Sequence, residues 1–128
     1  MELDFFGKGT QFDHIGIAVR SIEDVTKTDK KTKDDTQKVC VSFFDSAGVR
    51  FELVEPACDN SPVTRLLKNN QSLYHVCFRV PDINASIKVS RNKGFHLVSG
   101  PVPAAAFGGK KIAWLFSKTL GLVELVEK

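Results

Sequence analysis

The chain has 128 residues, of which 42% are apolar and 26% charged, with a formal net charge of +3. This length predicts one domain with a single core, and the small charge, without aromatic residues interleaved among the lysines, argues against nucleic-acid binding. No window approaches the roughly 18 apolar residues that a membrane span needs, so we expect neither a nucleic acid nor a membrane as partner.

The N-terminus and the cysteines predict a cytoplasmic protein. Residues 1–10 carry acidic residues early and lack the apolar core of roughly 7–15 residues that a secretion signal contains. Cys40, Cys58 and Cys77 are odd in number and widely spaced, which fits reduced thiols better than a disulfide framework or a zinc site.

The first predicted strand, HIGIAV at residues 14–19, places His14 and Ala18 on one face and three branched apolar residues on the other. The segment that follows, residues 23–37, contains one apolar residue, Val25, and no amphipathic stripe. We therefore expect a solvated loop there, mobile or extended over residues 26–36 and not helical. The strand RFELVEP at 50–56 then places Glu52 on one face and Phe51 and Leu53 on the other. We expect a helix to pack on this apolar face.

Two helices are predicted after this strand. The first begins where Ser61 precedes Pro62, a favourable first helical residue. The second covers residues 83–93, with Asp82 as its cap and Gly94 as its stop. Between and after the helices, HVCFRV at 75–80 and LVELVE at 122–127 repeat the two strand patterns described above.

The chain is two copies of one unit. At an offset of 61, FDHIGIAVRSIED lies over LYHVCFRVPDINA, and QKVCVSFFDSAGVRFELVE lies over KKIAWLFSKTLGLVELVE further on. The matched residues include His14 with His75, Val19 with Val80, Ile22 with Ile83, and Glu52 with Glu124. Each copy begins with a histidine strand and ends with a glutamate strand, and the two modules cover residues 11–56 and 72–128.

This pattern predicts an α+β fold in which a βαβββ module occurs twice within one domain, residues 1–128. His14 and Glu52 are 38 positions apart, whereas His75 and Glu124 are 49 apart, so the first module is 11 residues shorter. Eleven residues make about three helical turns. The first module therefore lacks most of its helix, its second strand, or parts of both.

The matched polar residues are candidate metal ligands, because each is a polar residue at an equivalent place in an otherwise apolar strand. Two imidazoles and two carboxylates suit one first-row divalent ion, such as Zn, Ni, Co, Mn or Fe. The four candidates are His14, Glu52, His75 and Glu124. A single histidine on a strand is more often a surface or hydrogen-bonded core residue, so the prediction rests on the four together.

The paired modules resemble the vicinal oxygen chelate superfamily, which includes glyoxalase I, methylmalonyl-CoA epimerase, extradiol dioxygenases and the fosfomycin and bleomycin resistance proteins. The resemblance is nearest to the epimerases and small glyoxalase-like proteins. It is carried by FDHIGIAVRSIED, FELVEPACDNSPV, SLYHVCFRVPDINASI and GGKKIAWLFSKTLGLVELVEK. It covers residues 11–128 except the loop at 23–37, where the family has helix and strand.

The resemblance implies that the two modules form one cupped mixed sheet, and that the four candidate ligands hold one divalent metal there. It also implies a metal-stabilised enolate formed from a substrate carbonyl. It also implies that Glu124 or Glu52 moves the proton. In epimerases a separate glutamate from the first module's second strand takes part, and Asp34 and Asp35 are the nearest acids left in that shortened region. The implied function is a metal-dependent isomerase, epimerase or lyase acting on a small α-oxo or acyl-thioester substrate.

Two other functions remain open. One is a non-catalytic small-molecule-binding protein of the bleomycin-resistance type, although such proteins usually lack the ligands kept here. The other is a structural or interaction domain with a vestigial metal site. An extradiol dioxygenase is disfavoured, because those chains generally carry four such modules.

Several residues near the predicted site have weaker assignments. The loop PAAAFGGKK at 103–111 is a candidate lid, with Lys110 or Lys111 touching an anionic substrate, although an ordinary connection fits better. Glu55 and Glu127 lie at strand ends and are expected to be solvent charges. His96 is expected to be structural or exposed, and Cys77 is expected to be a packing residue.

The sequence also predicts a homodimer. The outer face of the first module presents apolar residues, among them Ile17 and Leu53, where the covering helix is shortened. Such a patch exceeds what monomers usually expose. We expect a second copy of the chain to cover this face, helped by Phe5 and Phe6 of the N-terminal extension.

Overall fold

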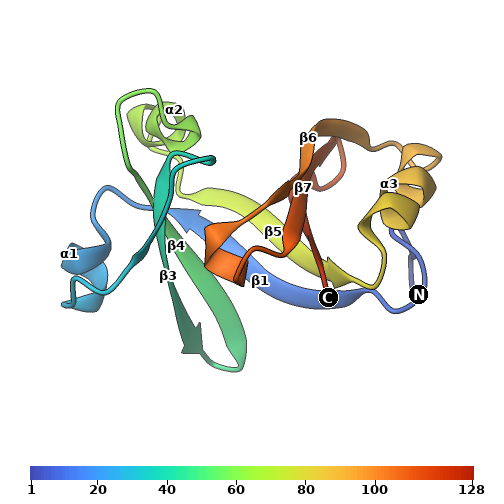
Figure 1. The fold of residues 1–128 in the computed structure, drawn as a ribbon, viewed down its shortest axis with the longest axis horizontal. Helices are drawn as coiled ribbons and strands as arrows, with labels where there is room; N and C mark the ends of the chain where they lie inside the picture. Colours follow the sequence, from blue (N-terminus) through green and yellow to red (C-terminus); the bar gives the residue numbers. More distant parts are fainter. The chain divides into compact units, whose positions relative to one another are not determined.

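The computed structural model describes residues 1–128 and contains eight strands and three α-helices (Figure 1). In chain order the elements are β1 (Gln11–Ala18), α1 (Ile22–Thr26), β2 (Thr32–Asp34), β3 (Val39–Ser46), β4 (Val49–Pro56), α2 (Pro62–Lys68), β5 (Leu73–Val80), α3 (Ile83–Arg91), β6 (His96–Pro103), the 3₁₀ turn η1 (Ala105–Phe107), β7 (Lys111–Ser117) and β8 (Gly121–Glu127). A strand, a helix and three strands thus occur twice. The predicted α+β class with two βαβββ modules is confirmed. None of the helices is long and apolar enough to cross a membrane.

The chain divides into two compact units that largely follow the modules. The first-module unit comprises residues 14–74 and 104–109, and the second-module unit comprises residues 1–13, 75–103 and 110–128. The loop at 104–109 therefore packs with the first module although it lies within the sequence of the second. The N-terminal residues pack with the second module although they precede the first.

The first-module unit has the strand order β2-β3-β4-β1. β4 pairs antiparallel with β3 and parallel with β1, and the parallel register sets Gly16 opposite Glu52. One face of these strands is covered by α2, and the buried cluster there consists of Ala18, Val39, Val41, Val54, Val63 and Leu67. This face is the one that carries His14 and Glu52, because residues two or four apart in a strand share a face.

The segment expected to be a solvated loop, residues 23–37, instead contains most of a one-turn helix and a short strand. Ser21 caps α1 through its hydroxyl, and Ile22 is fully buried against Leu53 on the outer face of the sheet. The prediction missed α1 because a single turn buries one residue and leaves no stripe in the sequence. Of the residues 26–36 predicted not to be helical, Thr26 is the last residue of α1, and residues 27–36 contain no helix.

The second-module unit has the strand order β5-β8-β7-β6. β8 pairs parallel with β5, with Cys77 opposite Glu124, and antiparallel with β7. Gly16 and Cys77 are equivalent in the repeat, as are Glu52 and Glu124. Both modules therefore use the same parallel register, as the duplication predicts.

The two predicted helices outside the shortened segment are present. α2 begins at Pro62, and α3 begins after Asp82, whose Oδ1 accepts a hydrogen bond from the Ala85 N–H at 3.1 Å. Gly94 adopts a positive φ of 88° where the chain leaves α3, a conformation that glycine adopts without the strain of a Cβ. α3 ends at Arg91, two residues before the predicted limit.

The N-terminal phenylalanines belong to the core of the second-module unit, so the prediction that they cover the first module is wrong. Phe6 is 3% exposed, and its ring centroid lies 5.0 Å from that of Phe95 and 5.3 Å from that of Phe78. Phe5 packs edge-on against Phe95 at 5.5 Å. α3 contributes Ile87 to the same cluster. These aromatic residues are far apart in the sequence, so their contacts arise from tertiary packing that no local pattern predicts.

Glu55 and Glu127 are not solvent charges as predicted, because each accepts a hydrogen bond from the first residue of its own module's helix. The Ile22 N–H donates to Glu55 at 2.9 Å, and the Ile83 N–H donates to Glu127 at 3.0 Å. A carboxylate at a helix N-terminus satisfies a free N–H and complements the helix dipole. Lys31 donates to Glu55 at 2.6 Å, and this hydrogen bond raises the pKa of Lys31 above its ordinary value.

Replacing Glu127 with Ala removes the acceptor of the Ile83 N–H and is expected to lower the free energy of unfolding by about 1–2 kcal/mol. Glu127→Gln keeps an amide oxygen as acceptor and is expected to lose less. Urea denaturation measures both values, with Glu2→Ala in the exposed N-terminal segment as the control. Equal stability of the wild type and Glu127→Ala would contradict the capping role.

Candidate metal centre

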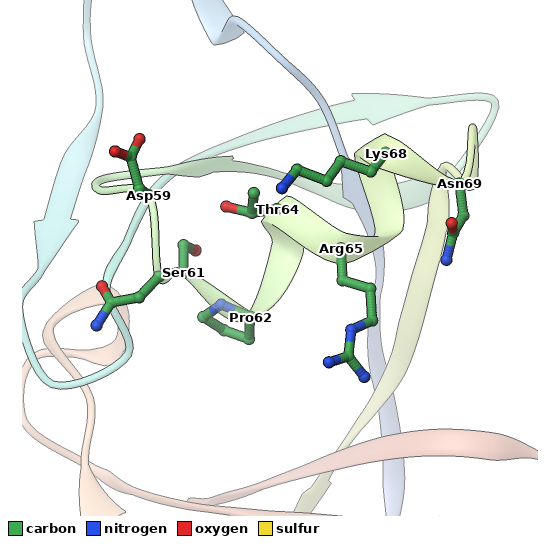
Figure 2. A pocket seen from close by; sticks show the side chains of 8 residues that line it. Asp59, Ser61, Pro62, Thr64, Arg65, Lys68 and Asn69 are labelled. Atoms are coloured by element: carbon green, nitrogen blue, oxygen red, sulfur yellow. The ribbon is translucent and has the colours of Figure 1, made fainter.

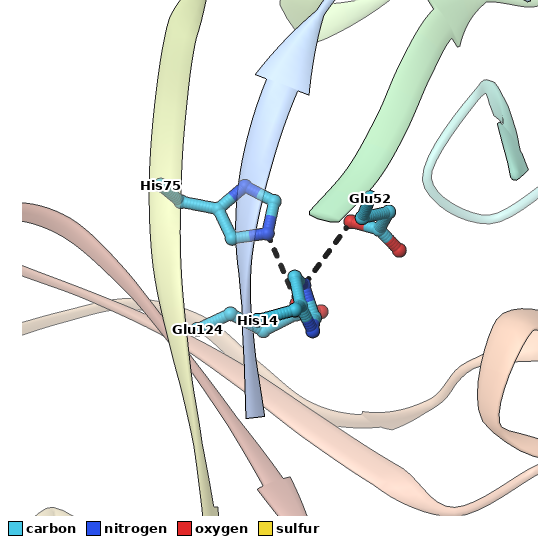
Figure 3. Close-up of side chains that lie close together, drawn as sticks. All are labelled: His14, Glu52, His75 and Glu124. Atoms are coloured by element: carbon cyan, nitrogen blue, oxygen red, sulfur yellow. Dashed lines mark ion pairs between the residues drawn. The ribbon is translucent and has the colours of Figure 1, made fainter. Parts of the chain in front are cut away.

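The first-module unit holds a buried histidine–glutamate pair. His14 lies on β1 and Glu52 on β4, and the distance between His14 Nε2 and Glu52 Oε1 is 3.3 Å (Figure 3). Their side chains are 0% and 5% exposed. The pair forms because β1 runs parallel to β4 with Gly16 opposite Glu52, which sets His14 one pleat away on the same face.

The second-module unit holds an equivalent pair. His75 lies on β5 and Glu124 on β8, and the distance between His75 Nε2 and Glu124 Oε1 is 3.2 Å (Figure 3). Their side chains are 1% and 4% exposed. The parallel register with Cys77 opposite Glu124 produces this pair as the register with Gly16 produces the first.

Aromatic rings surround the imidazole of His14. Phe43 of β3 meets it edge-on with 5.4 Å between ring centroids, and Phe107 of η1 stacks on it at 5.9 Å and 23°. The guanidinium of Arg50 lies 4.1 Å above the ring of Phe43. These rings exclude water from one side of His14, which strengthens electrostatic interactions at the pair.

The imidazole of His75 lies against an indole ring. The ring of Trp114, on β7, lies perpendicular to the imidazole with 4.8 Å between centroids, and Trp114 is 8% exposed. Trp114 is the one tryptophan in the sequence. Its fluorescence therefore reports on the surroundings of His75 without interference from another indole.

The chemistry of the pairs fits a divalent metal ion. Each pair offers one imidazole nitrogen and one carboxylate oxygen, and all four side chains are buried. Burying a carboxylate is costly unless it is paired with a cation or a metal ion. Imidazole and carboxylate together suit first-row ions such as Zn, Mn, Fe, Co or Ni.

The loop at 104–109 is anchored at its first residue, and a role for it as a lid with a lysine at the substrate stays a prediction. Ala104 is 2% exposed, and Lys110 and Lys111 are exposed. Phe107, and neither lysine, is the residue of this loop that contacts His14. Sequence reasoning missed Phe107, although an aromatic residue just before two glycines was a signal available at that position.

Asp34 anchors this loop. Its Oδ1 accepts a hydrogen bond from the Gln37 N–H at 2.9 Å, and its Oδ2 accepts one from the Ala105 N–H at 3.1 Å. Asp34 is 5% exposed, whereas the side chain of Asp35 is 87% exposed and lies 3.4 Å from Lys33. Both oxygens of Asp34 are thus engaged in holding the backbone beside Phe107.

His96 and the three cysteines lie outside the two histidine–glutamate pairs. His96 is exposed on β6, and Cys77 is fully buried on β5. Cys40, Cys58 and Cys77 are all free thiols. None of the sulfurs forms a disulfide, as the cysteine spacing predicts.

Comparison with known proteins identifies the family. A model of the glyoxalase/bleomycin resistance protein/dioxygenase superfamily matches residues 13–114. The chain belongs to this superfamily. The match begins beside His14 and ends at Trp114, and so includes three of the four residues of the two pairs. The resemblance inferred from the sequence is confirmed.

Relatives of this superfamily member include proteins with and without a known activity. It is 33% identical over 130 residues to the uncharacterised Bacillus subtilis protein YqjC, with 91% of either chain covered. It is 32% identical over 91 residues to human mitochondrial methylmalonyl-CoA epimerase, covering 68% of this chain and 51% of that one. The alignment thus spans about half the length of the human epimerase.

A solved epimerase has a similar fold. The structure of a variant of Streptomyces coelicolor methylmalonyl-CoA epimerase in complex with 2-nitronate-propionyl-CoA is 25% identical, with a TM-score of 0.74. The superposition covers 92% of this chain and 94% of that chain.

Asp34→Ala is expected to release the loop at 104–109, because the Ala105 N–H loses its acceptor. Hydrogen exchange of the Ala105 amide measures this release, and we expect its protection to fall at least about tenfold, the change for one lost hydrogen bond. Asp35→Ala, next in sequence and exposed, is the matched control. Unchanged protection in Asp34→Ala would show that the loop is held by packing alone.

Proposed function

We propose that the chain is a divalent-metal-dependent epimerase, or a related isomerase or lyase, that acts on an acyl-thioester or small α-oxo substrate. The observation that carries this proposal is the pair of buried histidine–glutamate sets at equivalent positions of the two modules. The methylmalonyl-CoA epimerases among the relatives support an acyl-CoA thioester as the substrate class.

We propose that both pairs bind one ion. The ligands are His14, Glu52, His75 and Glu124, each with one donor atom. A bound divalent ion supplies Lewis-acid polarisation of a substrate carbonyl, which lowers the cost of removing a proton from the adjacent carbon. The imidazoles must be neutral to act as ligands, so metal affinity falls as the pH drops below the usual histidine range.

The proton is moved by a carboxylate of these pairs. Glu124 and Glu52 are the candidates, since each is buried beside an imidazole. Asp34 is a poor candidate, because both of its oxygens hold backbone N–H groups. Phe43 and Phe107 keep water from His14, and exclusion of water protects a reactive carbanion from unwanted protonation.

The alternative is a small-molecule-binding protein without catalysis. The aromatic rings of Phe43 and Phe107 favour it, because apolar walls with a few polar groups characterise ligand sites. Such a protein binds its ligand with the metal removed and exchanges no substrate proton. A cytoplasmic location suits either function, given three free thiols.

Metal content provides the first test. Protein purified without a histidine tag is expected to contain, or to bind, one divalent ion per chain, measured by mass spectrometry of the metal. Titration with Co²⁺ is expected to quench the emission of Trp114, which lies beside His75. His75→Ala is expected to abolish both signals, whereas His96→Ala, on the exposed histidine, is expected to keep them. Full metal binding by His75→Ala would contradict the proposed ligand set.

Proton exchange provides the second test. Wild-type protein with metal is expected to exchange the α-proton of methylmalonyl-CoA in D₂O, followed by NMR. Glu124→Gln keeps an oxygen ligand but cannot take up the proton, so its rate is expected to fall by about 10²–10⁴-fold. Exchange that persists after metal removal would indicate a mechanism without metal.

We also propose that the chain forms a homodimer. Phe44 and Phe51 stack at 5.1 Å on the outer side of the first-module unit, where Ile17 and Val19 are only partly buried. An apolar surface of this kind is a suitable contact for a second copy. Sedimentation velocity at micromolar concentration is expected to give about twice 14.2 kDa for the wild type and a monomer for Phe44→Asp. A monomeric wild type would refute the dimer.

A further inference from the structure

The sheet of the second-module unit has two faces with different surroundings. On one face Leu115 and Val123 are fully buried in the core cluster to which α3 contributes. The other face carries Trp114 of β7 and Glu124 of β8, which are cross-strand partners. This other face is therefore the one on which the His75–Glu124 pair lies.

An apolar strip continues this face beyond the pair. Phe116 on β7 and Leu122 on β8 are cross-strand partners, each two residues along its strand from Trp114 or Glu124, so they share the face of the pair. Val98, on the neighbouring strand β6, is the extra residue where the β6–β7 register shifts opposite Trp114. We call Val98, Phe116 and Leu122 the apolar strip.

The strip is exposed to solvent although it is apolar. Val98 is 59% exposed, Phe116 is 45% exposed and Leu122 is half-buried. Single exposed apolar residues are ordinary, whereas neighbouring ones on adjacent strands mark a surface that binds an apolar partner. Two residues along a strand span about 7 Å. A ligand held at the His75–Glu124 pair therefore reaches the strip with its next few atoms.

The hollow at the start of α2, in the first-module unit, offers no such arrangement. Its two basic side chains, Arg65 and Lys68, point apart (Figure 2). The hydroxyl oxygens of Ser61 and Thr64 are buried and out of reach of a ligand there. The open face beside the His75–Glu124 pair is thus the surface that combines buried polar groups with apolar walls, the composition of ligand sites.

We propose that the apolar strip binds an apolar acyl group of the substrate, and that Phe116 and Leu122 make this chain prefer acyl groups larger and more apolar than methylmalonyl. The carbonyl end of such a ligand lies at the His75–Glu124 pair and its apolar end lies on the strip. Assigning the acyl group to a substrate is the one step that rests on the proposed function.

Fluorescence titration of the full-length protein tests the strip. The probes are N-acetylcysteamine thioesters with acetyl, butyryl, hexanoyl and octanoyl groups, followed by the emission of Trp114, which lies on the same face as Phe116. A fully buried methylene is worth about fourfold in affinity, so one that lies against a single wall is expected to add about twofold. Affinity that does not rise with acyl length would overturn the proposal.

A matched pair of variants locates the binding. Phe116→Ser removes an apolar wall and is expected to lower the octanoyl-to-acetyl affinity ratio at least about tenfold. The control is Phe12→Ser, because Phe12 is 46% exposed and its ring lies 6.3 Å from that of Phe78, which packs on the core cluster with α3. Phe12→Ser is expected to keep the ratio, and an equal loss in both variants would overturn the site.

Leu122→Ala keeps the proposal testable if Phe116→Ser does not fold. It shortens the cross-strand partner of Phe116 and is expected to lower the same affinity ratio several-fold. An unchanged ratio in folded Leu122→Ala would remove the strip as the binding surface.

A second copy of the chain is the competing occupant of the strip. If it covers the strip, Phe116→Ser lowers the sedimentation coefficient while acyl length has no effect on binding, and this result would overturn the proposal. Proton exchange without any effect of acyl length refutes the strip alone. An effect of acyl length without proton exchange supports the strip as an acyl-binding surface and refutes only the proposed catalysis.

Discussion

The parity of the parallel strand pairing is the constraint on which both histidine–glutamate pairs depend. Gly16 lies opposite Glu52, and Cys77 lies opposite Glu124. The histidine of each module lies two residues before this glycine or cysteine, so it shares a face with the glutamate of the neighbouring strand. A slip of one residue would turn every side chain of a strand to the opposite face. The same parity explains why the sequence ELVE occurs twice. Residues three apart in a strand point to opposite faces, so the first glutamate faces the histidine while the second faces the helix.

The shortened first module is completed by contacts from elsewhere in the chain. α1 keeps one turn, and Ile22 packs against Leu53 in a small buried cluster. β2 keeps three residues, and Asp34 at its end holds the backbone at Ala105, 71 residues away. This anchored loop brings Phe107 onto His14. The loss of 11 residues therefore left the first histidine–glutamate pair buried and walled by aromatic rings.

The two pairs are alike in their geometry and differ in their surroundings. His14 lies among phenylalanine rings contributed by β3 and the loop at 104–109. His75 lies against the indole of Trp114, contributed by a strand of its own module. The two modules share the strand register but differ in the residues around each histidine. Duplication of a strand motif produces this result, because the register is set by backbone hydrogen bonds and the neighbours by side-chain packing.

The sequence by itself determined the features that follow from local periodicity and spacing. Strand alternation placed His14 and Glu52 on defined faces, Asp82 and Gly94 bounded α3, and the repeat gave two modules of unequal length. These predictions succeeded because pleat, capping and helical period act over a few residues. The homodimer and the sharing of one ion by both pairs remain predictions.

Only the tertiary structure decided which residues complete these elements. Glu55 meets Ile22 across 33 residues, and Glu127 meets Ile83 across 44. The roles of Phe6, Phe107 and Asp34 likewise depend on partners remote in sequence. A carboxylate at a strand end or a phenylalanine in a loop has the same local pattern whether it is exposed or packed. Its role is fixed by the groups that folding brings beside it. A buried polar group needs such a contact, because burying it without a hydrogen-bond partner costs free energy.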